Sequence, residues 1–169
     1  MKLFFIGFMG CGKTHWGKAV SNKLQLPFFD LDEEIVQSEG KSINDLFGYE
    51  GEEYFRMTEK DMLYKITETN SSFVMATGGG TPCFFNNIDY LNKQGLTIWI
   101  NCSVECLFSR LVKEKEQRPL IRSLTDHQLH SYIQKKYFDR KIFYQKAKLV
   151  LQGNAGLTLE KIVNEIFHH

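Results

Sequence analysis

The segment GFMGCGKT, residues 7–14, constrains the fold of this chain more than any other stretch. It matches the pattern GxxxxGK[ST] without a mismatch, it follows the apolar run LFFIGF, and it opens a segment with helical spacing that ends at Gln25. Glycine lets the backbone curl so that its N–H groups face a phosphate, and the helix N-terminus adds partial positive charge. We therefore predict a strand, a phosphate loop and a helix in that order.

The motif indicates that the loop binds a nucleoside triphosphate. Lys13 can reach the β- and γ-phosphates, and the Thr14 hydroxyl can ligate Mg²⁺. A glycine-rich turn without a ligand is the structural alternative, and for the His15 side chain the simpler interpretation is that it faces solvent or packs on a neighbour. The expected nucleotide contacts in this segment are Gly10, Cys11, Gly12, Lys13, Thr14 and His15.

Strand-like and helix-like segments alternate along the whole chain. Apolar runs predict strands at 3–8, 27–32, 72–80, 96–102 and 147–152. Helical spacing and capping residues predict helices at 13–25, 32–40, 42–47, 52–70, 88–94, 103–115, 124–147 and 157–167. The alternation predicts an α/β protein with a five-stranded parallel sheet flanked by helices on both faces. Ligands of such sheets bind beyond the carboxyl ends of the strands, so one cleft is expected there.

Length and composition suit a single domain that covers residues 1–169. The net charge of +1 shows no basic footprint for nucleic acid, and no apolar run approaches the roughly 20 residues that span a bilayer. The four cysteines show no CxxC pair, so we expect free thiols and a cytoplasmic location. We also expect a monomer, and from the charge and the hydropathy no nucleic-acid or membrane partners. Five aromatic residues of one predicted helix are expected in the core: Tyr132, Tyr137, Phe138, Phe143 and Tyr144.

Two aspartates, Asp30 and Asp32, end the short apolar run of the second predicted strand. Strand residues two apart point to the same face, so both carboxylates are expected to aim into one space. No long apolar run ends in a lone aspartate, which leaves this pair to support a metal and to hold a substrate hydroxyl. For Asp32 alone an N-cap is an equally good interpretation, because a helix is predicted to begin there.

Further motifs, in order along the chain, resemble those of the shikimate kinases. They are GxxGxGKT at the start, FxDxD at 28–32, GEEYFR at 51–56, GGG at 78–80, RPL at 118–120 and DRKIFY at 139–144. The resemblance implies a phosphate-loop kinase fold of the nucleoside-monophosphate-kinase type, with a substrate-binding helical region at about 32–62 and a mobile lid at about 114–125. It also implies transfer of the γ-phosphoryl group of ATP to the 3-hydroxyl of shikimate, in aromatic amino acid biosynthesis, with Mg²⁺ as cofactor.

The resemblance assigns residues to the nucleotide and the metal. Lys13 contacts the phosphates, and Thr14 binds Mg²⁺ with support from Asp30 through water. Arg118 is the lid arginine that closes over ATP, and Arg110 stacks near the adenine. Lys13 and Arg118 are both expected to be catalytic, because they stabilise charge on the transferred group.

The resemblance also assigns the acceptor site. Arg56 and Arg140 suit the carboxylate of shikimate, because arginine makes bidentate charge-assisted bonds. Asp32 is the third catalytic residue, which orients the hydroxyl. The alternatives are a surface ion pair with Glu59 for Arg56, a solvated basic run for Arg140 and a plain turn for the glycines. The expected substrate contacts are Asp32, Arg56, Gly78, Gly79, Gly80 and Arg140.

Two positions depart from the family pattern. His15 stands where the family usually has Ser or Thr, and Ile142 stands where it usually has proline, which affects the backbone that carries Arg140. The rival functions are a kinase for another polyol acid such as gluconate, a non-catalytic nucleotide-dependent switch, and a nucleoside monophosphate kinase. Turnover that depends on shikimate distinguishes these functions.

Overall fold

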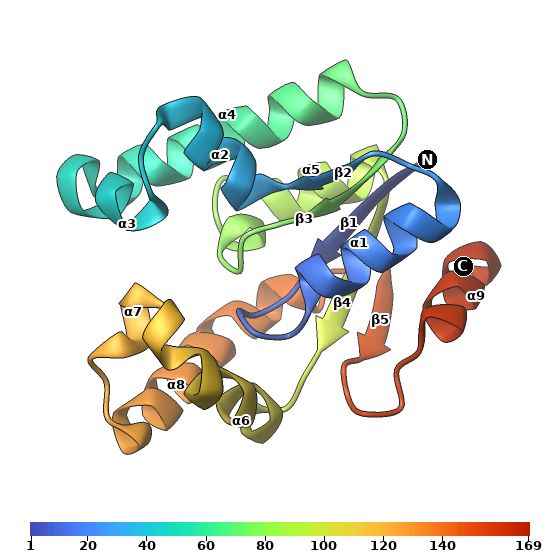
Figure 1. Ribbon diagram of the computed structural model, residues 1–169. Helices are drawn as coiled ribbons and strands as arrows, with labels where there is room; N and C mark the ends of the chain where they lie inside the picture. The colour runs from blue at the N-terminus through green and yellow to red at the C-terminus, as the bar shows by residue number, and fades with distance from the viewer.

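Five parallel strands form the centre of the structure, a computed structural model that describes residues 1–169 (Figure 1). Their order in the sheet is β2-β3-β1-β4-β5, and all four neighbouring pairs are parallel, so the predicted sheet is confirmed. The strands are β1 (Lys2–Ile6), β2 (Phe28–Asp30), β3 (Phe73–Ala76), β4 (Leu96–Asn101) and β5 (Leu149–Gln152).

The burial of the strands follows from their positions in the sheet. The four residues of β3 are all buried, and so are the four inner residues of β4, because helices cover both faces of these strands. The edge strand β5 alternates buried and exposed residues. This pattern explains why the central strands read as continuous apolar runs in the sequence.

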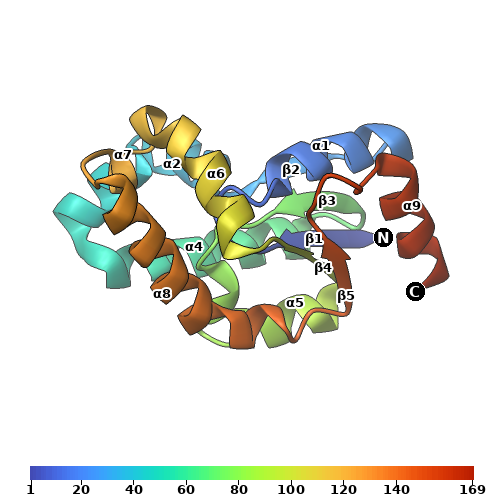
Figure 2. The same ribbon diagram turned by 90° about the horizontal axis from the view of Figure 1, so that it is seen from below.

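Helices cover both faces of the sheet. Figure 2 shows α1 and α9 on one face and α5 on the other. Two helix groups extend beyond the carboxyl ends of the strands: the upper group α2–α4 and the lower group α6–α8 (Figure 1). The helices are α1 (Lys13–Leu24), α2 (Leu31–Glu39), α3 (Ile43–Asp45), α4 (Gly51–Thr69), α5 (Asn87–Gln94), α6 (Val104–Glu114), α7 (Pro119–Arg122), α8 (Asp126–Tyr144) and α9 (Leu159–His168).

The residues that predicted the helix ends act as caps in the structure. Ser42 and Ser103 are N-caps, whose side chains accept hydrogen bonds from the amides three residues further on. Gly40 and Gly95 are C-caps of α2 and α5. A π-helical turn (Leu46–Glu50) and two 3₁₀ turns (Thr81–Cys83 and Lys115–Gln117) complete the secondary structure.

The second strand is shorter than predicted. It ends at Asp30, and α2 begins at Leu31, so the expectation that Asp30 and Asp32 share one face of a strand is wrong. The physical reason is local capping. The Asp30 carboxylate accepts hydrogen bonds from the amides of Asp32 and Glu33, which ends the extended chain and starts the helix.

One of the five aromatic residues expected in the core lies outside it. Tyr137 and Tyr144 are buried, whereas Phe138 is 63% exposed because the next residue on a helix points about 100° away from its neighbour. The other two, Tyr132 and Phe143, are partly buried and pack against the core. The four cysteines form no disulfide, and no helix is both long and apolar enough to cross a membrane.

Candidate active site

The phosphate loop between β1 and α1 presents unused backbone donors. Gly10 and Gly12 adopt positive φ angles of 78° and 101°, which a side chain would strain. This backbone path leaves several amides without a protein acceptor at the start of α1, and no acidic residue lies in the first turn of that helix. The amides that donate to no protein acceptor include those of Gly10, Gly12, Lys13, Thr14 and His15.

Lys13 folds back over this loop. Its ammonium is nearly buried and donates to the carbonyl oxygens of Gly7 at 2.9 Å and Phe8 at 3.0 Å. Cys11 contributes differently from the other loop residues, because its side chain is fully buried and its amide donates to Phe8 O at 3.2 Å. The His15 side chain is exposed and lies edge-on to Trp16, as the simpler interpretation predicts. Only the backbone of His15 therefore faces the loop.

Thr14 and Asp30 lie together where α1, β2 and α2 meet. Thr14 Oγ1 donates to Asp30 Oδ2 at 2.7 Å, while Asp30 Oδ1 caps α2. The N-cap of α2 is thus Asp30, and the interpretation of Asp32 as that cap is wrong. No group of three or more His, Cys, Asp or Glu residues is placed to hold a metal ion. A hydroxyl and a carboxylate alone suit a cation that takes its other ligands from phosphate and water.

Asp32 lies in the first turn of α2 and lines the cleft beside the phosphate loop. The pKa of this carboxyl is raised from 3.8 to about 6, first by burial and then by the charges of Glu59 and Asp30, while Lys13 and Arg56 lower it. The group is therefore ionised at neutral pH and binds a proton more readily than an ordinary aspartate. This combination suits a side chain that holds a substrate hydroxyl and accepts its proton.

Arg56 of α4 is buried rather than on the surface. Its Nη1 donates to Glu59 Oε2 at 2.8 Å, so the predicted ion pair is confirmed, but as a buried pair. The guanidinium also lies 4.2 Å from the centre of the Phe84 ring. Pairing and stacking together hold the guanidinium in one orientation.

Glu59 and Thr81 are functional candidates that the sequence analysis missed. Glu59 has no exposed surface, and its Oε1 accepts a hydrogen bond of 2.5 Å from Thr81 Oγ1. The spacing of three residues from Arg56 pointed to Glu59 only as an ion-pair partner. Nothing in the sequence pointed to Thr81, which lies 22 residues away along the chain.

The glycine loop, residues 78–80, leaves no room for a side chain at Gly78 or Gly80 unless a neighbouring side chain moves. A Cβ on Gly78 would lie 2.8 Å from Glu59 Oε1, and a Cβ on Gly80 would lie 2.5 Å from Arg56 Nη2. The amides of Gly78, Gly79 and Gly80 donate to no protein acceptor, and all three residues line the cleft. A plain turn explains neither the steric requirement nor the three unused donors.

Arg140 projects from α8 toward the same loop. Its Nη1 lies 3.4 Å from the position of a Cβ on Gly79, and no carboxylate lies within ion-pair distance of it. Lys135 is exposed, as a residue of a solvated basic run would be, whereas Arg140 is partly buried and lines the cleft. Ile142, in place of the family proline, is 63% exposed, and α8 runs unbroken past it.

The two arginines predicted to contact the nucleotide, Arg110 and Arg118, are bound to protein groups in this structure. Arg118 pairs with Glu114 of α6 at 2.7 Å, although it also lines the cleft. Arg110 donates to Cys11 O at 3.2 Å and to Gly153 O at 2.9 Å. Arg110 thus connects the phosphate loop to the loop after β5. This structural role was not predicted, and the expected stacking near adenine stays a prediction.

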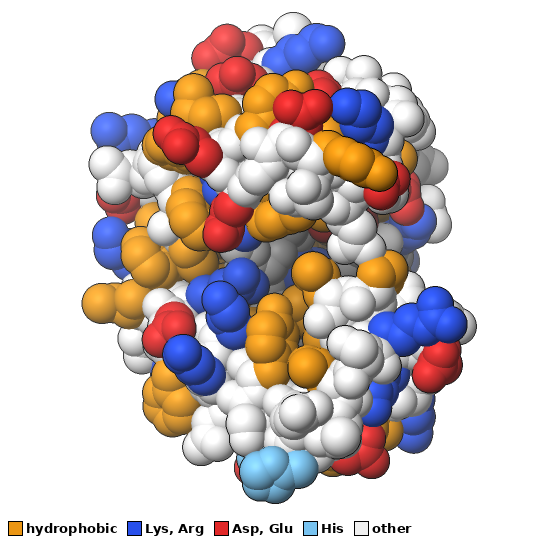
Figure 3. Space-filling view, turned by 90° about the vertical axis from the view of Figure 1, so that its left-hand side faces the viewer, with side chains coloured by type: hydrophobic (Ala, Val, Ile, Leu, Met, Phe, Trp, Pro, Cys, Tyr) orange, Lys and Arg blue, Asp and Glu red, His pale blue; other side chains and the backbone are white.

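A cleft of about 300 Å³ brings most of these side chains together. Figure 3 shows the hollow between the upper and lower helix groups, with Lys and Arg side chains on its lower rim. Two further residues of α8, Tyr132 and Lys136, line it and were not predicted. Lys136 is partly buried and makes no hydrogen bond or ion pair with the protein. The charged residues on the cleft wall are Asp32, Glu52, Arg56, Glu59, Arg118, Lys136 and Arg140.

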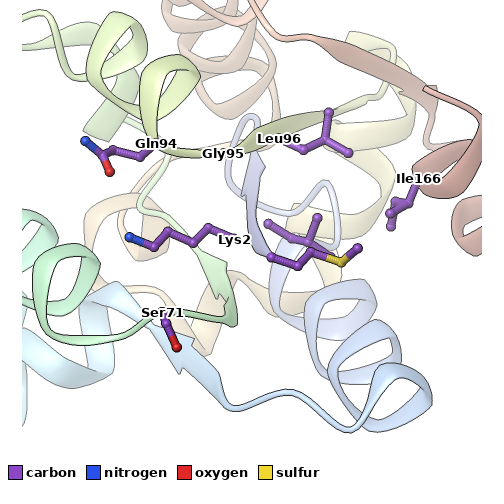
Figure 4. A pocket seen from close by; sticks show the side chains of 8 residues that line it. Lys2, Ser71, Gln94, Gly95, Leu96 and Ile166 are labelled. Carbon is purple, nitrogen blue, oxygen red and sulfur yellow. The ribbon is translucent and has the colours of Figure 1, made fainter.

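A second pocket, of about 460 Å³, lies at the amino end of β1 and is separate from this cleft. Figure 4 shows Lys2 and Gln94 on one side of it and Ile166 of α9 on the other. The Lys2 ammonium donates to Thr67 O at 2.6 Å and the N-terminal ammonium of Met1 donates to Ser72 Oγ at 2.7 Å, so both cations of the lining residues are already engaged.

The strand order, the phosphate loop and the adjoining cleft define a phosphate-loop kinase for a small acceptor. The sequence model described as shikimate kinase matches residues 9–169. The chain therefore belongs to the shikimate kinase family.

Individual relatives agree with this assignment. The chain is 39% identical to the shikimate kinase of Bacteroides fragilis over 150 residues, which are 89% of this chain and 83% of that protein. The crystal structure of the shikimate kinase from Bacteroides thetaiotaomicron has a TM-score of 0.89 and 34% identity, over 99% of this chain and 95% of that one. The shikimate kinase from Acinetobacter baumannii in complex with shikimate has a TM-score of 0.85 and 29% identity, over 99% and 93% of the two chains.

Proposed function

We propose that this protein transfers the γ-phosphoryl group of ATP to the 3-hydroxyl of shikimate. The observation that carries the proposal is the arrangement of the cleft. Arg56, Arg140 and the free amides of the glycine loop form a binding surface for a carboxylate, and Asp32 lies beside the phosphate loop. Shikimate has one carboxylate at one end of its ring and hydroxyls at the other, which matches this polarity.

The nucleotide phosphates bind at the start of α1, where unused amides and the Lys13 ammonium converge. Thr14 and Asp30 offer the hard oxygen ligands that fit Mg²⁺. When bound there, the ion supplies neutralisation of the negative charge on the phosphates. Arg110 holds the loop through its bond to Cys11 O, and we assign this arginine to the adenine side of the site.

Asp32 orients the acceptor hydroxyl and takes up its proton as the phosphoryl group moves. Its raised pKa of about 6 makes it a stronger base toward the attacking hydroxyl than an ordinary aspartate, while it remains ionised at neutral pH. The transfer is direct and in line, without a covalent enzyme intermediate, because positioning and charge stabilisation account for most of the catalysis. Lys13 and Arg118 provide the positive charge for the transferred group.

Residues 114–125 act as the lid of a single domain, and residues 32–62 form the acceptor-binding region. Ile121 is the one fully buried side chain of the lid segment, so few contacts oppose its movement. The Arg118–Glu114 pair is 39% and 44% exposed at its two side chains, and such pairs contribute at most about 1 kcal/mol. Arg118 can therefore exchange Glu114 for a phosphate at little cost. We propose that the protein acts as a monomer.

The test is ADP release by the purified protein with Mg-ATP, with shikimate, with gluconate and with no acceptor. Turnover that requires shikimate, and a phosphorylated shikimate product identified by mass spectrometry, are the expected results. Turnover with gluconate alone would identify a different polyol-acid kinase. Nucleotide binding without turnover on either acid would support the rival interpretation of a nucleotide-dependent switch.

A further inference from the structure

Tyr144, the last residue of α8, makes a buried contact with the glycine loop. Its side chain has no exposed surface, its hydroxyl donates to Gly79 O at 2.6 Å, and its ring packs 5.9 Å from the Trp99 ring of β4. Burial raises the pKa of this phenol far above its ordinary value. The hydroxyl therefore stays protonated and serves as a fixed hydrogen-bond donor.

This hydrogen bond orients the peptide unit between Gly79 and Gly80. The other backbone hydrogen bonds of the loop carbonyls are local, from Thr81 N to Gly78 O and from Cys83 N to Gly80 O. The bond from Tyr144 is the one that connects the loop to a distant element, 65 residues away along the chain. Because a peptide unit is planar and trans, holding Gly79 O toward Tyr144 directs the N–H of Gly80 to the opposite side.

The same helix carries Arg140 one turn before Tyr144. The Arg140 guanidinium approaches Gly79 to 3.4 Å, measured to the position of a Cβ. The anion-binding surface has two parts, the loop amides and the Arg140 guanidinium. Helix α8 contacts the loop through Tyr144 and also carries Arg140, so it connects the two parts. A shift of the helix relative to the loop changes the distance between the guanidinium and the loop amides.

We infer that Tyr144 is a positioning residue for acceptor binding, which holds the glycine loop and Arg140 in register for the substrate carboxylate. It does not touch the substrate, and its effect passes through Gly79 and Arg140. This inference rests on the proposed function and deepens it, since it names the element that gives the carboxylate site its geometry.

The chain offers a matched control on the same helix. Tyr137 is also buried, and its hydroxyl donates to Asn101 Oδ1 at 2.8 Å, away from the glycine loop. The substitutions Tyr144→Phe and Tyr137→Phe each delete one buried hydroxyl and one hydrogen bond. A merely structural role predicts the same behaviour for both variants.

The experiment measures thermal stability, kcat, the KM of each substrate, and the calorimetric Kd of shikimate without nucleotide. Both variants are expected to lower Tm to a similar extent. Tyr144→Phe should raise the Kd and KM of shikimate roughly three- to tenfold, the loss typical of one hydrogen bond, and leave the KM of ATP within about twofold. Tyr137→Phe should leave all three affinities unchanged. An unchanged shikimate Kd in Tyr144→Phe, or an equal loss in Tyr137→Phe, overturns the inference.

Two further measurements keep the tests independent. If Tyr144→Phe does not fold, hydrogen exchange of the wild-type protein replaces it. Shikimate should then protect the amides of residues 78–80 and of the last turn of α8 together, and protection confined to residues 78–80 would refute the coupling. Failure of the proposed function appears separately, as a wild-type protein that neither binds nor phosphorylates shikimate.

Discussion

The contact between Gly80 and Arg56 gives the most direct test of the acceptor site. Gly80 has φ −90° and ψ −16°, a backbone conformation that alanine adopts freely, so Gly80→Ala introduces a steric change without backbone strain. The added Cβ would lie 2.5 Å from Arg56 Nη2, 2.7 Å from Nη1 and 2.8 Å from Cζ. Since Glu59 and the Phe84 ring hold the guanidinium, it must leave its position to make room.

The magnitude follows from the bonds that the guanidinium would lose. A hydrogen bond to a charged group contributes about 1.5–3 kcal/mol, so a displaced Arg56 should cost about 2–3 kcal/mol of acceptor binding. At 1.4 kcal/mol per tenfold change, the KM of shikimate should rise about 30- to 150-fold. Partial loss of the Arg56–Glu59 pair should cost about 1–2 kcal/mol of stability, which lowers Tm by about 2–8 °C.

The assay is steady-state ADP release with shikimate varied at saturating ATP, then with ATP varied at saturating shikimate, together with thermal unfolding. The KM of ATP should not change. Gly48→Ala is the matched control, because no atom lies within 4 Å of its added Cβ. A lower Tm with an unchanged shikimate KM would show that Arg56 is structural only. No change in either quantity would refute the steric argument itself.

Substitutions at three other site positions each test a single role. Asp32→Asn should reduce kcat by orders of magnitude. In the wild type, kcat/KM should fall as pH falls through about 6, where Asp32 binds its proton, and the variant should not show this loss. An unchanged kcat would leave Asp32 without a catalytic role. The raised pKa means that the folded state gains stability as pH falls from about 6 toward 4, so at pH 7 Asp32→Asn should increase the free energy of unfolding, by at most about 3 kcal/mol in a denaturant titration. Asp30→Asn keeps an N-cap of similar strength, so it should preserve Tm, but it should raise the Mg²⁺ concentration required for half-maximal turnover. Asp30→Ala should raise that concentration and also lose about 1 kcal/mol of stability. Equal Mg²⁺ requirements in the wild type and both variants would exclude a metal role. Lys136→Gln should raise the KM of shikimate severalfold while Lys135→Gln should not, because Lys136 lines the cleft without a protein partner and Lys135 is exposed; matching KM values would show that only bulk charge matters.

Local patterns predicted much of the fold and part of the site. Ser42 and Ser103 identified helix starts because a capping side chain bonds to an amide only three residues away. The phosphate loop was predictable for the same reason, since its shape depends on glycines and a helix start within a few residues. The Arg56–Glu59 pair was also found, because residues three apart on a helix are neighbours.

The prediction for Asp30 and Asp32 failed at the choice between two local structures, a strand and a capped helix. Asp30 and Asp32 were assigned to one strand, and the apolar run before them fits that assignment. The hydroxyl of Thr14 donates to Asp30 Oδ2 and two amides of α2 donate to Asp30 Oδ1, and together these bonds end the strand at that residue. A contact with a residue 16 positions away is not visible in a short sequence window.

The sequence by itself determined the class of chemistry, because the phosphate loop and the capped helices are short patterns whose physics is local. Only the tertiary structure decided which groups surround each charge. It buried Glu59 against Arg56 and Thr81, raised the pKa of Asp32, and joined Tyr144 to Gly79 across 65 residues of chain. Burial and long-range hydrogen bonds depend on how separate elements pack, and the acceptor site takes its geometry from that packing.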